Sequence, residues 1–168
     1  MVQVKVHGVA LLPPDEAPVM LLREIEGRRR WLAVSIGAPE ATALIAACQR
    51  VEHPRPDTIE LIGQVIESFG GRVQRVEVTA LEAGVFFADL VLSDGVHVSA
   101  RPSDAVAIGV RAGAPLEVPE SVLGVASVEL DLVDEDEAGP EVEQEVADFR
   151  SQLDDVTAED FGEPPPER

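Results

Sequence analysis

Val98-Ser-Ala-Arg-Pro-Ser-Asp-Ala-Val-Ala-Ile-Gly-Val-Arg-Ala-Gly-Ala-Pro115 is the stretch of the chain that decides the fold. Its first residues end a strand, and the Arg-Pro step that follows is a natural boundary because the residue before a proline favours extended backbone. A helix is predicted from about Asp104 to Arg111, with Ser103 as a suitable cap and with Gly113 and Pro115 ending it. A strand that runs directly into a helix in this way indicates a mixed fold.

The remainder of the chain supplies more strands than helices. Val2, Val4 and Val6 alternate with polar residues, as in a half-buried strand. Asp57 and Glu60 stand three residues apart, which predicts a capped helix start. Strands are predicted at about 2–6, 19–25, 28–36, 76–80, 85–92, 96–100 and 116–118, helices at about 39–51, 58–69 and 104–111, while 122–132 is ambiguous. This order predicts an α+β fold: mixed, largely antiparallel sheets with about three packed helices.

Charge divides the chain into two parts. The 168 residues carry a formal net charge of −19. Residues 127–168 hold 16 Asp or Glu against two Arg, a net charge of −14, which leaves −5 for residues 1–126. We therefore predict one domain over 1–126 and an acidic tail over 127–168, with a candidate helix at 141–153. A tail of this charge keeps a protein soluble and repels nucleic acid.

Several classes of protein are disfavoured by composition and spacing. The single cysteine, Cys48, excludes an internal disulfide and is expected to be a buried small apolar residue rather than a nucleophile. The three histidines are too widely spaced for a zinc site. No signal peptide and no apolar run of roughly 20 residues is present, so we expect a cytoplasmic protein without a membrane segment. The only basic run, Arg28–Arg30, is expected to be a solvated strand end.

The start of the helix near residue 103 is the first candidate site. Backbone N–H groups at a helix start attract anions, and the guanidinium of Arg101 beside them suits a phosphate. Asp104 could hold a divalent metal ion or position a water molecule. The alternative is structural and, on physical grounds alone, commoner: Ser103 or Asp104 caps the helix, and Arg101 pairs with Asp104 or another carboxylate.

Three further residues are candidates on weaker grounds. Glu40 lies in the first turn of a predicted helix, where the helix dipole alone favours a carboxylate, and a role as metal ligand or general base needs other carboxylates nearby. Arg55 lies between two prolines and presents a guanidinium either to phosphate or to its own loop. Glu60 has the capping-box role as its alternative.

Taken together, these segments resemble the bifunctional nuclease (DNase/RNase) domain family, in its actinobacterial form. The hallmark is Ser99-Ala-Arg-Pro-Ser-Asp-Ala-Val-Ala-Ile108, and three other stretches agree in order and spacing. These are Gly37-Ala-Pro-Glu-Ala41, Pro54-Arg-Pro56 and Gly84-Val-Phe-Phe-Ala-Asp-Leu90. The resemblance covers nearly the whole chain.

The resemblance implies an α+β domain that self-associates, with a dimer favoured, and that hydrolyses DNA and RNA. The family has no agreed catalytic set, so the residues matching its recurrent positions are the candidates. Glu40, Glu60 and Asp104 are assigned to catalysis, with Glu40 and Asp104 also as metal ligands for an ion such as Mg²⁺. Arg55, Arg101 and Ser103 are assigned to substrate binding.

Two departures from the family pattern bear on activity. The family often has Arg-Pro-x-Thr-His-Asp before its second helix, whereas this chain has Ile59 in place of the histidine and Glu60 in place of the aspartate. The segment Leu32-Ala-Val-Ser-Ile-Gly37 also differs from the family's Leu-Pro-Ile-Trp-Ile-Gly. A second hypothesis is therefore a non-catalytic, homo-oligomeric binding or regulatory protein that keeps the fold.

Overall fold

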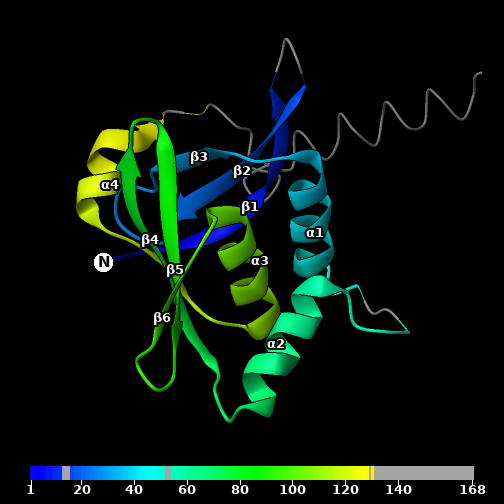
Figure 1. The fold of residues 1–168 in the computed structure, drawn as a ribbon. Coiled ribbons are helices and arrows are strands. Elements are labelled where there is room, and N and C mark those ends of the chain that lie inside the picture. Colours follow the sequence, from blue (N-terminus) through cyan, green and yellow to red (C-terminus); the bar gives the residue numbers. More distant parts are fainter. Residues whose placement is uncertain (13–15, 52–53, 129, 131–168) are drawn as a thin grey trace, which may run out of the picture. The chain divides into compact units, whose positions relative to one another are not determined.

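The computed structural model describes residues 1–12, 16–51, 54–128 and 130 (Figure 1). The chain divides into two units, Met1–Glu129 and Leu130–Arg168, and all the helices and strands of the described residues belong to the first. The predicted helix at 141–153 lies outside the described residues. Within them, no helix is both long and apolar enough to cross a membrane.

Eight strands form one sheet within the described residues, in the order β6-β5-β4-β7-β1-β2-β3-β8. All neighbouring strands run antiparallel except β4 and β7, which run parallel. The strands are β1 (Val2–Leu12), β2 (Ala17–Glu24), β3 (Trp31–Ser35), β4 (Val73–Glu82), β5 (Val85–Leu92), β6 (His97–Ala100), β7 (Leu116–Val118) and β8 (Ser127–Val128). The prediction of a mixed, largely antiparallel α+β fold is confirmed.

The short strand β7 joins the two halves of the sheet. On one side Leu116 pairs with Val76 of β4, and on the other it pairs with Val4 of β1. All three side chains are buried and belong to one apolar core. Strands β4–β6 and strands β1–β3 therefore become a single sheet through only three residues.

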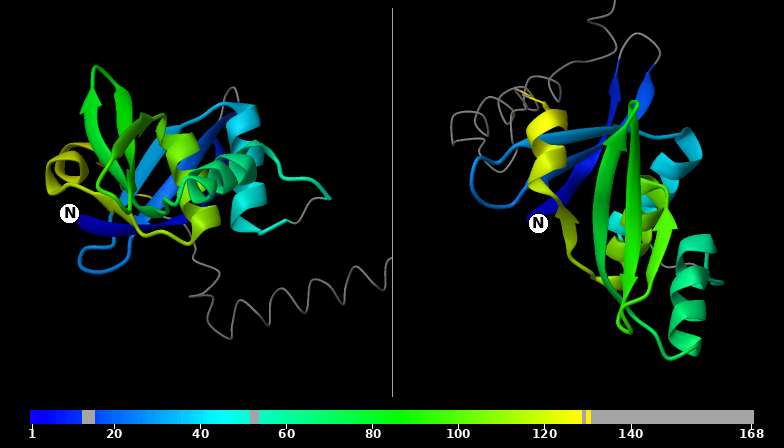
Figure 2. Two further views of the ribbon diagram at one scale, coloured as in Figure 1. Left: turned by 60° about the horizontal axis from the view of Figure 1, so that its bottom comes forward. Right: turned by 60° about the vertical axis from the view of Figure 1, so that its left-hand side comes forward.

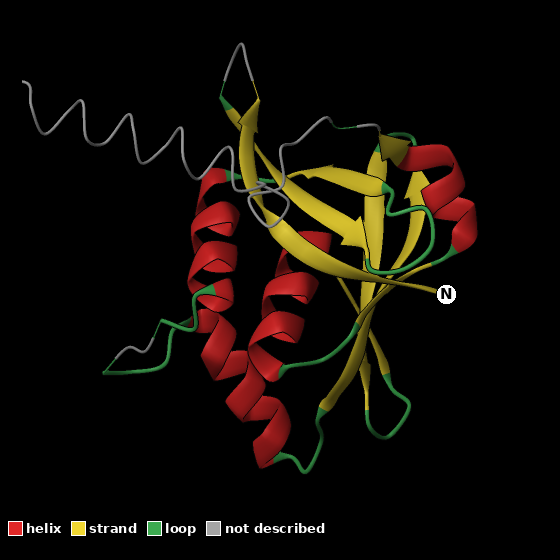
Figure 3. Cartoon of the chain, turned by 180° about the vertical axis from the view of Figure 1, so that it is seen from behind, coloured by secondary structure: helices red, strands yellow, loops and turns green. Residues whose placement is uncertain are grey.

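Four helices accompany the sheet in the described residues: α1 (Ala38–Cys48), α2 (Thr58–Ser68), α3 (Pro102–Ala112) and α4 (Glu120–Ala126). Helices α1, α2 and α3 gather on one side, as Figure 3 shows from behind. Helix α3 packs on β4 and β5, α1 packs beside it on β1 and β2, and α2 packs on α3. Helix α4 lies at the other end of the sheet, beside β3, β4 and β8 (Figure 2). The segment that the sequence left ambiguous is thus α4 followed by β8.

Local signals account for the helix ends, with one correction. Asp57 caps α2 and Glu60 returns a hydrogen bond to the backbone of Asp57, so the predicted capping box is confirmed. Helix α3 ends at Gly113 with φ of 70°, a left-handed conformation that glycine adopts without strain. The prediction that Ser103 caps α3 was wrong. The helix begins at Pro102 with Arg101 as its N-cap, because proline is suited to the first helical position.

Helix α3 is the most deeply buried helix of the domain. Its residues 105–109 are all buried against β4, β5 and the other helices. Gly109 makes this close approach possible, because a Cβ there would fall on the side chain of Val76. The N-terminus of α3 is consequently held at a fixed position relative to the sheet.

Helix α2 is amphipathic, but most of its apolar face is exposed rather than buried. Only Ile59 is buried, whereas an apolar stripe made of Leu61, Ile62, Val65 and Phe69 is exposed, and Phe69 is 89% exposed. The acidic residues of α2 lie on the opposite side of the helix. Self-association remains a prediction, and an exposed apolar stripe is one of the kinds of surface that mark interaction sites.

Cys48 also lies differently from the prediction, since it is exposed at the end of α1. The buried residues of α1 are Ala41, Leu44 and Ala47, so the helix is rotated away from the face that includes Cys48. Partial burial raises the pKa of the Cys48 thiol, which lowers its thiolate fraction and disfavours a nucleophilic role.

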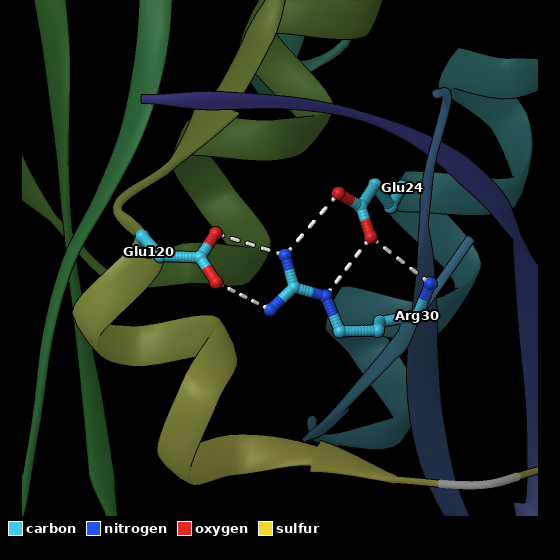
Figure 4. A network of polar contacts seen from close by, with 3 residues as sticks. All are labelled: Glu24, Arg30 and Glu120. Atoms are coloured by element: carbon cyan, nitrogen blue, oxygen red, sulfur yellow. Dashed lines mark hydrogen bonds and ion pairs between the residues drawn. The ribbon is translucent and has the colours of Figure 1, made fainter. Parts of the chain in front are cut away.

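Arg30 departs from the prediction of a solvated strand end. It donates to both carboxylate oxygens of the buried Glu24, through Nε at 2.9 Å and Nη2 at 3.2 Å, and to Glu120 at 2.7 and 2.9 Å (Figure 4). Arg28 and Arg29 are exposed, as predicted. Arg30 therefore ties the β2–β3 turn to the first turn of α4.

This network predicts a loss of stability in acid. Hydrogen bonds from Arg30 lower the pKa of Glu24 below its ordinary value of 4.5. A carboxyl whose pKa is lower in the folded state stabilises the fold above its unfolded pKa, and that contribution is lost as the pH falls through the folded pKa. Between about pH 5 and about pH 3 we expect the free energy of unfolding to fall less steeply in Glu24→Gln than in wild type.

Urea denaturation at each pH measures this difference, with Glu26→Gln, which changes an exposed neighbouring carboxylate, as control. Equal slopes in all three proteins would contradict the prediction.

Candidate functional site

Arg101 is the centre of a cluster of charged residues at the N-terminus of α3. Its Nε and Nη2 donate to the two carboxylate oxygens of Asp104 at 2.6 and 3.1 Å. Its Nη1 lies 2.7 Å from Oε1 of Glu40, which comes from the first turn of α1. The structure thus brings together four residues that the sequence selected: Glu40, Arg101, Ser103 and Asp104.

Each member of the cluster is positioned by its local backbone. Arg101 has extended backbone, with φ of −66° and ψ of 144°, as expected of a residue before proline. Glu40 folds back over Gly37, and a Cβ at position 37 would collide with its carboxylate. Gly37 is therefore required for the observed position of Glu40, a role that the sequence did not suggest.

Arg101, Glu40 and Ser103 border an open cavity of about 600 Å³, and Asp104 lies beside it through its bond to Arg101. A volume in the range of roughly 300–1,000 Å³ is usual for small-molecule sites. The side chain of Arg101 is 65% exposed, so its guanidinium is accessible from this cavity. The wall combines the end of β3, the start of β5 and the first residues of α1 and α3: Ala33, Val34, Ser35, Ile36, Gly37, Glu40, Gly84, Val85, Phe86, Arg101, Pro102 and Ser103.

The electrostatics of the cluster are those of one cation shared by two anions. The carboxylate of Asp104, and secondly that of Glu40, raises the pKa of Arg101 above its ordinary value. With both carboxylates ionised the cluster has a net charge of −1. Within the described part of the chain, no three Asp, Glu, His or Cys residues are grouped as a metal site. Two carboxylates suffice for Mg²⁺ only when a substrate phosphate and water complete its coordination.

Arg55 and Glu60 line a different cavity, of about 420 Å³, between α2 and α3. Here Glu60 forms an ion pair with Arg111 of α3, and Arg111 Nη2 also donates to the backbone oxygen of Val51 at 2.8 Å. The six candidate residues therefore fall into two groups. Asp104 and Arg111 are seven residues apart in α3, which corresponds to about 10 Å along the helix.

Arg111 was missed in the sequence, although its spacing carried a signal. Asp104, Ile108 and Arg111 follow one another at intervals of four and three residues, and such residues share one face of a helix. A further half-buried carboxylate, that of Asp89, lies beside a histidine, with Oδ2 3.3 Å from Nδ1 of His97. This pair is on β5 and β6, apart from both cavities.

Comparison with known proteins identifies the family of the chain. Residues 20–131 match the bifunctional nuclease domain, and this range includes the charged residues of both cavities. An uncharacterised protein of Mycobacterium tuberculosis is 41% identical over 162 residues, which make up 96% of this chain and 98% of that protein. Bifunctional nuclease 2 of Arabidopsis thaliana is 30% identical over 113 residues, 62% of this chain and 34% of the plant protein. Bifunctional nuclease 2 of Oryza sativa subsp. japonica is 28% identical over 127 residues, 69% of this chain and 39% of that protein. The family match covers the fold and the Arg101 cluster alike, and this chain belongs to the bifunctional nuclease domain family.

Proposed function

We propose that the protein hydrolyses phosphodiester bonds of DNA and RNA, with the scissile phosphate bound by Arg101. The observation that carries the proposal is an accessible guanidinium held between two carboxylates at the start of α3, beside a cavity large enough for a nucleotide. A guanidinium fork matches phosphate oxygens in geometry and charge. The family membership of the chain supports the same reaction class.

In the proposed reaction the substrate exchanges partners with the cluster. A phosphate oxygen takes up the N–H donors of Arg101 that otherwise serve Asp104. The backbone N–H groups of Ser103 and Asp104, in the first turn of α3, add donors of the kind that bind anions at helix starts. Arg101 remains paired with Glu40, which keeps the guanidinium in place.

Release from Arg101 leaves Asp104 free to act as a general base. It accepts a proton from water, the water oxygen forms a bond to phosphorus, and the bond from phosphorus to the leaving sugar oxygen breaks, with that oxygen protonated by solvent. Glu60 lies in the other cavity and is bound to Arg111, so we give it no part in this reaction.

A divalent ion such as Mg²⁺ would be held by Glu40 and Asp104 together with the substrate phosphate. It would supply charge neutralisation on the phosphoryl oxygens. The net charge of −1 on the cluster favours the arrival of a cation with the phosphate, because a phosphodiester alone would meet net repulsion.

The test is cleavage of labelled single-stranded DNA, duplex DNA and RNA by the full chain at low salt, with Mg²⁺, Mn²⁺, Ca²⁺ or EDTA. We expect cleavage that depends on a divalent ion and is lost in the double variant Glu40→Ala, Asp104→Ala. Glu26→Ala, which removes an exposed carboxylate that does not line the cavity, serves as control. Full activity in the double variant would remove the two carboxylates from the mechanism.

A second candidate is a non-catalytic, homo-oligomeric binding or regulatory protein that keeps the fold. It is favoured by the pairing of the arginines: Arg30 binds Glu24 and Glu120, Arg101 binds Glu40 and Asp104, and Arg111 binds Glu60. Paired cations contribute less to the neutralisation of phosphates. Binding of nucleic acid without cleavage under any of the metal conditions above would favour this candidate.

A further inference from the structure

The residues that line the cavity between α2 and α3 are those of a binding site rather than of a packing defect. Its floor is apolar, formed by Ile59 and Ile108, whereas Arg55, Gln64 and Glu67 supply polar groups at its edge. Position 63 is a glycine within α2, and a Cβ there would meet open space. The cavity therefore has room for a planar ring over an apolar floor.

The walls of this cavity are held by charged contacts. Arg111 bridges from α3 to Glu60 at the start of α2 and to the backbone oxygen of Val51 beyond α1. The prolines on both sides of Arg55 restrict its backbone. Arg55 itself has no ion pair or hydrogen bond among the described residues, in contrast to Arg30, Arg101 and Arg111, so its guanidinium is available to a ligand.

One face of α3 connects this cavity with the Arg101 cluster. Asp104, Ile108 and Arg111 lie on that face, with Asp104 in the cluster and the other two lining the cavity. Their separation of about 10 Å along the helix axis compares with a rise of roughly 3.4 Å per nucleotide along one strand of a duplex. About three nucleotides would span the distance between the two sites.

We propose that the Arg55 cavity is a second nucleotide subsite. It holds a nucleotide of the bound strand about three positions away from the phosphate at Arg101. Its base enters the cavity over Ile59 and Ile108, where Gln64 and Glu67 face its polar edge, and its phosphate binds Arg55. Single-stranded nucleic acid is commonly recognised by stacking of a base on an aromatic ring or a guanidinium and by hydrogen bonds to its edge. In this cavity the two isoleucines would take the place of the aromatic ring. The inference rests on the proposed function for the identity of the ligand.

The test separates binding from cleavage by using EDTA and two substrate lengths. Fluorescence anisotropy measures the affinity of the full chain for a labelled dinucleotide and a labelled decanucleotide, each as DNA and as RNA, at low salt. For Arg55→Gln we expect about tenfold weaker binding of the decanucleotide and a salt dependence reduced by about one phosphate contact. The dinucleotide, which is too short to reach both sites, should bind with unchanged affinity.

Two further variants serve as controls. One removes a positive charge outside the cavity, and the other fills the cavity without a change of charge. Arg50→Gln removes an exposed arginine that does not line the cavity and should bind the decanucleotide as wild type does. Gly63→Leu fills the cavity from an open helix position without a change of charge and should weaken decanucleotide binding as Arg55→Gln does.

The outcomes separate this inference from the proposed function. Equal losses in Arg55→Gln and Arg50→Gln, or unchanged binding in Gly63→Leu, would overturn the subsite. Loss of decanucleotide affinity in Arg55→Gln and Gly63→Leu, with no cleavage by wild type when Mg²⁺ is added, would support the subsite and count against the nuclease. Absence of any oligonucleotide binding by wild type, both in EDTA and with Mg²⁺ present, would overturn both.

Discussion

Arg101→Ala is expected to lower the rate of metal-dependent cleavage by about 10²–10³-fold, the usual loss when one donor to a developing charge is removed. Arg101 is the only side chain that contacts both carboxylates of the cluster in the described structure. Without it, Glu40 and Asp104 face each other as like charges, and the phosphate loses its fork of donors. The measurement is the single-turnover rate on labelled single-stranded DNA.

Two controls define this result. Arg101→Lys keeps the positive charge but cannot form two parallel hydrogen bonds, so it should recover only part of the rate. Arg72→Ala removes an exposed arginine that lines neither cavity and should leave the rate unchanged. Cleavage by Arg101→Ala at the wild-type rate would place the reaction elsewhere in the molecule.

Gly109→Ala is expected to lower the free energy of unfolding by about 1–3 kcal/mol, although alanine is the better helix former. The added methyl group would collide with the side chain of Val76, which is 1% exposed and cannot move aside. Leu116 Cδ2, 3.4 Å from the same position, closes the space further.

The matched control is the same substitution in a neighbouring helix. Gly63→Ala in α2 places its methyl group in open space, so only the gain in helix propensity remains, up to about 1 kcal/mol of added stability. Urea denaturation with unchanged m-values measures both. Shifts of the two midpoints in the same direction would contradict the packing of α3 on β4 that is described above.

The sequence predicts those parts of the structure whose geometry is set by residues close together in the chain. The capping box of Asp57 and Glu60, the left-handed glycine after α3 and the pairing of Arg101 with Asp104 all involve residues within four positions of one another. Their geometry follows from the backbone of one helix end, and sequence spacing is sufficient to recognise it.

The parts that could not be predicted depend on residues far apart in the chain. Glu40 and Arg101 are brought together by the packing of α1 on α3, and no local pattern marks them as a pair. The exposure of Cys48 and of the α2 stripe follows from how each helix is rotated on its neighbours. An apolar stripe predicts that a helix has an apolar face, and it does not predict that the rest of the domain covers that face.

The candidate site shows the same division. Asp104 and Arg101 were correctly grouped because they are neighbours in sequence, whereas Glu60 and Arg55 were grouped with them through the family pattern alone. The structure places the latter pair with Arg111, at the other end of α3. Helix α3, of 11 residues, separates these two groups of charged residues, and the sequence alone does not show that the groups lie apart.

The position of β7 in the middle of the sheet has a consequence for synthesis of the chain on the ribosome. Strand β1 is made first, but its partner on that side, Leu116–Val118, follows more than 100 residues later. At roughly 5–20 residues per second this delay is on the order of ten seconds. During that time β1 presents an unpaired edge, and β4 presents another once it has been made, the feature that promotes aggregation of nascent β proteins. Lys5, the only lysine in the sequence, lies on β1, where a charged side chain opposes such pairing. A nascent chain that stalls before Leu116 would hold two separate antiparallel pieces, and the three-residue strand β7 converts them into one sheet.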